Sequence, residues 1–103
     1  MSKQIYRYEF QSGAPMEEVE EALLLAIVAT ESLHGESEVR LDAVYFLDPA
    51  KRVCVIDAST VVGKDVNRLF TGFLAREFGR NAFKVKHVDH APEGAELSQP
   101  TVA

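Results

Sequence analysis

The fold is decided by residues 39–58, which read VRLDAVYFLDPAKRVCVIDA. Two apolar segments, residues 39–47 and 52–58, flank the sequence Asp48-Pro49-Ala50-Lys51. Asp followed by Pro is typical of the first two positions of a type I turn. The pattern therefore predicts a β-hairpin in which Asp48 pairs with Lys51.

The segments on either side of this hairpin predict two helices and two more strands. Residues 5–10 alternate apolar and charged side chains, which is the period of a half-buried strand, and residues 83–88 form the last strand. A helix is expected from Pro15 to about His34, because Pro suits the first helical position and Gly35 favours a left-handed end. Ser59 or Thr60 caps a second helix, which ends before Gly79.

The predicted order is strand, helix, strand, strand, helix, strand. With right-handed crossovers this order gives an α+β fold of the ferredoxin-like βαββαβ type, a two-layer sandwich with a four-stranded antiparallel sheet and two helices on one face. We expect a single domain over residues 1–88. Residues 89–103 change to Pro, Gly, Ser and acidic side chains without a period, which predicts a disordered C-terminal tail.

Composition limits the class of protein. The chain has 103 residues, 47% hydrophobic and 26% charged, which is typical of one globular domain. The apolar run from Leu23 to Ala29 is much shorter than the ~20 residues that span a bilayer. One cysteine excludes a disulfide scaffold and favours the cytoplasm, and the formal net charge of −5 argues against generic nucleic-acid binding.

The hairpin predicts a group of charged residues on one sheet face. If Asp48 pairs with Lys51, Asp42 lies opposite Asp57 and Arg40 lies next to them on the same face. Two carboxylates directly across a ladder repel each other and raise one pKa. Arg40, Asp42 and Asp57 are therefore candidates for an acid/base or binding site. The alternative is an ordinary salt-bridged cluster in which arginine side chains neutralise the pair.

The same face, which the helices leave open, carries a contiguous apolar area. It consists of Val44, Phe46, Val53 and Val55. A soluble monomer rarely leaves such a patch uncovered, so we expect self-association through this face, contact with another protein, or a ligand pocket.

The predicted helices add two further surface features. Spacing by four residues places a basic stripe on the second helix: Lys64, Arg68, Gly72, Arg76 and Arg80. A solvated helix face explains such a stripe, and an acidic protein partner is the more specific alternative. Nucleic acid comes after these two, because four cations alone are a small electrostatic footprint. Gly72 disfavours a helix interior by about 1 kcal/mol relative to Ala and so indicates a flat position where a partner approaches closely. On the first helix, Leu24, Leu25 and Val28 are left to pack on the neighbouring helix or on another subunit.

No catalytic or metal-binding spacing stands out. His87 and His90 fit no closed structural site, and Cys54 is expected to be an inert core thiol, so we expect no metal and no cofactor. The sequence favours a non-enzymatic cytoplasmic association module that acts as a homodimer or contacts another protein, with neither membrane nor nucleic acid as partner. The alternative is a small dimeric enzyme or ligand-binding protein whose charged pocket is formed by Arg40, Asp42 and Asp57.

Overall fold

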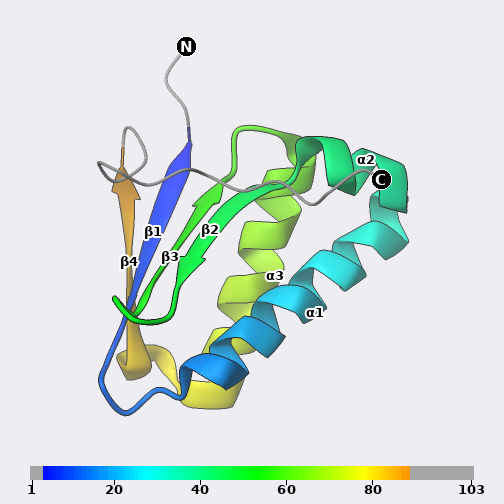
Figure 1. The fold of residues 1–103 in the computed structure, drawn as a ribbon. Coiled ribbons are helices and arrows are strands. Elements are labelled where there is room, and N and C mark those ends of the chain that lie inside the picture. The colour runs from blue at the N-terminus through cyan, green and yellow to red at the C-terminus, as the bar shows by residue number, and fades with distance from the viewer. Residues whose placement is uncertain (1–3, 89–103) are drawn as a thin grey trace.

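The computed structural model describes residues 4–88, which form four strands and three α-helices (Figure 1). In chain order the elements are β1 (Ile5–Phe10), α1 (Met16–His34), α2 (Glu36–Asp42), β2 (Val44–Asp48), β3 (Val53–Asp57), α3 (Val61–Phe78) and β4 (Phe83–Val88), with a 3-10 turn, η1, at Arg80–Ala82. The predicted tail, residues 89–103, lies outside the described residues.

The sheet is antiparallel throughout, and its strand order is β2-β3-β1-β4. The helices α1 and α3 lie side by side over one face of this sheet (Figure 1). The predicted α+β class and the two-layer arrangement with a four-stranded antiparallel sheet are therefore confirmed. The predicted number of helices was wrong, because α2 interrupts the expected βαββαβ order.

The main core lies between the sheet and the two long helices. Alternate residues of β1 and β3 meet one side of α1 and one side of α3, as the strand and helix periods require. The buried members of this core include Tyr8, Phe10, Cys54, Ile56, Val19, Leu23, Ile27, Val66, Phe70 and Leu74. No helix in the described part of the chain is long and apolar enough to cross a membrane.

The predicted C-terminal ends of the two long helices are confirmed, whereas Pro15 is the extended N-cap of α1 instead of its first helical residue. Gly35 and Gly79 follow the last residues of α1 and α3 with φ angles of +89° and +86°, a conformation that only glycine adopts without strain. The Thr60 hydroxyl oxygen accepts a 3.0 Å hydrogen bond from the backbone N–H of Gly63, which makes Thr60 the N-cap of α3.

The first part of the predicted hairpin is a helix instead of a strand. Residues 36–42 form α2, with glutamates in its first turn and Arg40 in its last, which the helix dipole favours. Val39 is buried, and Ala43, one helical turn later, is buried on the same side. The apparent alternation of residues 39–43 therefore reflects a short amphipathic helix rather than a strand.

The hairpin register also differs from the prediction by two residues. Asp48 pairs with Val53, not with Lys51, because four residues form the loop and Arg52 takes a left-handed φ of +58°. The Arg52 guanidinium donates hydrogen bonds to the carbonyl oxygens of Gln11 and Ala14, which ties this loop to the one before α1. A shift of two residues keeps every side chain on its predicted face.

Candidate functional site

The three charged residues expected to share the open sheet face do not line up there. Arg40 belongs to α2, where its guanidinium lies 2.7 Å from the carboxylate of Glu36. Asp42 is the last residue of α2, and only Asp57 belongs to the sheet. Val44 faces Asp57 across the ladder, so the predicted pairing of Asp42 with Asp57 was wrong. One oxygen of Asp57 instead accepts a 2.9 Å hydrogen bond from the backbone N–H of Ser59.

The apolar residues of the open sheet face form a small second cluster. Val44, Phe46, Val53 and Val55 do share this face, in the observed register. Val53 and Val55 are buried together with Ile5, whereas Phe46 and Val88 pack against them half-buried. Most of the apolar surface on this face is therefore already removed from water.

Charged side chains on the same sheet face form ion pairs with one another. The carboxylate of Glu9 lies 3.0 Å from Nε of Arg7 and 3.3 Å from Nζ of Lys86. The hydrogen bond from Lys86, and to a smaller extent that from Arg7, lowers the pKa of Glu9. These three side chains form a local charge network across β1 and β4.

The basic stripe lies on the outer side of α3, away from the core. Lys64, Arg68, Gly72 and Arg76 are exposed, and nothing lies within 4 Å of the position that a Cβ atom would take on Gly72. Arg80 lies beyond the end of α3, in η1, so it does not continue the helical row. Arg68 makes only a long 4.0 Å contact with Asp65.

A group of three neighbouring, exposed apolar side chains lies on α1. Leu24, Leu25 and Val28 are 54%, 54% and 55% exposed, and their spacing places them on one face of the helix. The sequence left open whether these residues pack on the neighbouring helix, and their exposure shows that α3 does not cover them. We name the exposed surface of the two long helices the helix face and define it by Leu24, Leu25, Val28, Arg68, Gly72 and Arg76.

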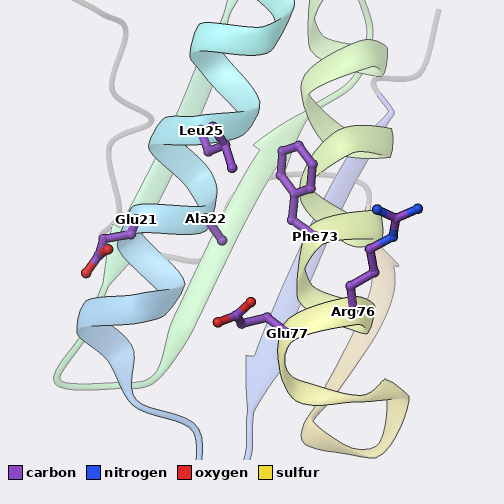
Figure 2. A pocket seen from close by; sticks show the side chains of 6 residues that line it. All are labelled: Glu21, Ala22, Leu25, Phe73, Arg76 and Glu77. Carbon is purple, nitrogen blue, oxygen red and sulfur yellow. The ribbon is translucent and has the colours of Figure 1, made fainter.

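A groove of about 410 Å³ divides the helix face between α1 and α3. Figure 2 shows Leu25 and Phe73 facing each other across it, with Ala22 beneath them. Glu21 and Arg76 are directed to opposite sides of the groove, and Glu77 points from α3 toward α1. The groove therefore has apolar walls and a rim that carries both signs of charge.

Two observations show how the helices lie against each other. The groove joins Leu25 in the middle of α1 to Phe73 in the second half of α3. Near the other end, Nε2 of His34 lies 2.6 Å from a carboxylate oxygen of Asp65. The two helices are therefore antiparallel, and the N-terminal half of α1 lies level with the C-terminal half of α3.

Two buried reactive groups belong to the core and not to a surface site. The Tyr8 hydroxyl hydrogen-bonds to Oδ1 of Asn67 and lies 2.7 Å from Oγ1 of Thr71. Burial raises the pKa of Tyr8, although the hydrogen bond with Thr71 opposes part of that shift. Burial also raises the pKa of the Cys54 thiol to about 12, as its expected core position implies.

Among residues 4–88, no group of three or more His, Cys, Asp or Glu side chains is arranged to hold a metal ion. The sequence and fold match no protein-family model, no curated protein and no solved structure.

Proposed function

We propose that this protein acts by association, as a homodimer that pairs through the helix face. The observation that carries the proposal is the exposure of Leu24, Leu25 and Val28, each more than half exposed on one face of α1. Three neighbouring large apolar side chains in water favour a partner surface, because burying each contributes roughly 1.5–3 kcal/mol.

The helix face is better suited to this role than the open sheet face. On the sheet face, Val53 and Val55 are already buried and the charges of Glu9 are already paired. On the helix face the apolar residues are exposed, and they border a groove with an apolar wall at Phe73. Association here removes more apolar surface from water than association through the sheet.

The alternative is an enzyme or ligand-binding protein that uses Arg40, Asp42 and Asp57, and it has less support. The guanidinium of Arg40 is already paired with Glu36 within α2. Asp57 accepts a hydrogen bond from the turn that follows β3. Neither arrangement leaves these groups directed at a common ligand.

We also propose that the fold is a ferredoxin-like sheet with one inserted helix. The support is that β3 lies between β1 and β2 and that β1 lies between β3 and β4. Each helical crossover therefore skips one strand, which is the split βαβ arrangement. In this view α2 is an extension of the first crossover.

The first experiment measures mass in solution by light scattering on a size-exclusion column, over a range of protein concentrations. We expect a dimer for the unmodified protein. Replacing Leu24 and Val28 by Ser should raise its dissociation constant by about 100-fold or more, because four exposed apolar side chains are lost per dimer.

The matched control is Leu33→Ser. Leu33 is 69% exposed on the same helix, but it follows Val28 by five residues and so points to a different side. This variant should dimerise like the unmodified protein. A monomer at every concentration, or equal weakening by both variants, would contradict the proposed function.

A further inference from the structure

We propose that the two copies pair about a two-fold axis that runs between α1 and α3, parallel to both helices. In this arrangement α1 of one copy lies on α3 of the other copy. The inference rests on the proposed homodimer and adds its geometry, and it follows from the distribution of charge and of small residues on the helix face.

The two helices carry opposite charges. Five glutamates and no Lys or Arg occur in α1, at positions 17, 18, 20, 21 and 31. In contrast, α3 carries Lys64, Arg68 and Arg76 against two acidic residues, Asp65, whose carboxylate contacts His34, and Glu77, so its formal net charge is +1. An axis parallel to the helices places the acidic helix on the basic one, twice. An axis perpendicular to the helices would place α1 on α1 and α3 on α3, so that each helix faces a helix of the same net charge, which is less favourable.

The groove supplies a specific charge pair. Glu21 and Arg76 lie at the same level along the helices, and they are directed to opposite sides of the groove (Figure 2). Rotation by 180° about an axis along the groove exchanges those sides and keeps the level. It therefore brings Glu21 of each copy onto Arg76 of the other. The antiparallel alignment similarly places Glu31 at the level of Arg68.

Gly72 gives the apolar residues of α1 a place to pack. In the antiparallel alignment of α1 and α3, Gly72 lies between Leu24 and Val28 in the direction of the helix axes. Because the position of a Cβ atom on Gly72 is open, the backbone of α3 is accessible at this point. The Leu24 and Val28 side chains of one copy can therefore approach α3 of the other more closely than a larger residue would allow.

The size of the face also fits a second copy. A helix of 19 residues, the length of α1, extends about 28 Å, and two packed helices are about 20 Å wide. The projected area is then on the order of 550 Å². The accessible surface of the same face is larger, because side chains protrude from it. A stable interface needs roughly 800 Å² of accessible surface from each partner.

The test exchanges the charges of the proposed pair. Glu21→Arg and Arg76→Glu each place like charges opposite each other at both contacts, so each variant alone should dimerise about tenfold more weakly or worse. An equimolar mixture of the two variants should recover a heterodimer close to the unmodified affinity, because both contacts then become attractive. Lys51→Glu, in the exposed loop between β2 and β3, is the control and should leave the affinity unchanged.

The outcomes separate this geometry from the proposed function. Weakened single variants with recovery on mixing support the two-fold axis along the groove. Single variants that dimerise normally, while Leu24→Ser with Val28→Ser abolishes the dimer, would overturn the axis but leave the homodimer standing. An unmodified protein that stays monomeric at all concentrations would overturn both proposals.

Discussion

The backbone of Gly63, in the first turn of α3, packs directly against the carbonyl group of Asp57 at the end of β3. A Cβ atom on Gly63 would overlap with that carbonyl oxygen, and it would also crowd the α-carbon of Ala58. The atoms it would meet belong to the backbone, so they cannot move aside as a flexible side chain could. The lack of a Cβ atom at position 63 therefore allows the first turn of α3 to lie this close to the end of β3.

Gly63→Ala should therefore lower the free energy of unfolding by about 1–3 kcal/mol, because the added methyl group forces α3 away from β3. The measurement is urea unfolding followed by circular dichroism, in the Leu24→Ser, Val28→Ser background so that association does not contribute. Gly72→Ala is the matched control. It lies in the same helix in open space and should raise the stability by up to about 1 kcal/mol. Equal effects at the two positions would show that helix propensity, and not the contact with Asp57, determines the result.

The buried hydroxyl of Tyr8 predicts a loss of stability in alkaline solution. Its pKa is raised above the ordinary value of 10.0 by burial, so the unfolded chain releases this proton at a lower pH than the folded protein does. The folded state is then disfavoured as the pH rises above about 10. Tyr8→Phe should reduce this alkaline decline, measured as unfolding free energy between pH 9 and 11, and the remaining part belongs to Cys54 and Tyr45, whose pKa values burial also raises.

The same substitution should lower stability at neutral pH by about 1–3 kcal/mol, because Oδ1 of Asn67 loses the proton donor that it has in the core. An unchanged alkaline decline in Tyr8→Phe would show that another group causes it.

Cys54 should resist thiol reagents while the protein is folded. The side chain is buried, so a reagent does not reach it in the folded protein. Burial also raises the pKa of the thiol to about 12, so the reactive thiolate is scarce near neutral pH. We expect labelling by an aromatic disulfide reagent to occur only through unfolding and to accelerate in urea along with the unfolding transition. A Cys54→Ala, Ser59→Cys variant carries an exposed thiol and should react at once. Fast labelling of Cys54 in native buffer would contradict its place in the core.

The sequence predicts the parts of the fold that depend on local chemistry. Gly35 and Gly79 define helix ends by backbone conformation, which is a local property, and both are confirmed; for the cap of α3 the sequence left Ser59 and Thr60 open, and the structure shows Thr60. The faces of the hairpin were also correct, because a register error of two residues preserves the alternation. The prediction of a strand at residues 39–42 was wrong. The helix α2 has about two turns and its buried residue is Val39, which gives too few periods to distinguish a helix from a strand.

The candidate surface was only partly predictable. Spacing along the chain identified Leu24, Leu25 and Val28 as surplus apolar residues and placed Lys64, Arg68, Gly72 and Arg76 on one side of a helix. The groove between Leu25 and Phe73 was not predicted, because it depends on how far one helix is displaced along the other. That displacement is set by packing on the sheet and by the contact of His34 with Asp65, which are not local in the sequence.

Because the acidic and basic helices lie side by side on one face, the proposed pairing limits the assembly to two subunits. Each copy presents both halves of the complementary surface, and one partner occupies both at the same time. Neither α1 nor α3 is then left to recruit a third chain, in contrast to a head-to-tail contact, which continues into filaments. Increasing the protein concentration should therefore convert the remaining monomers into dimers without producing larger oligomers.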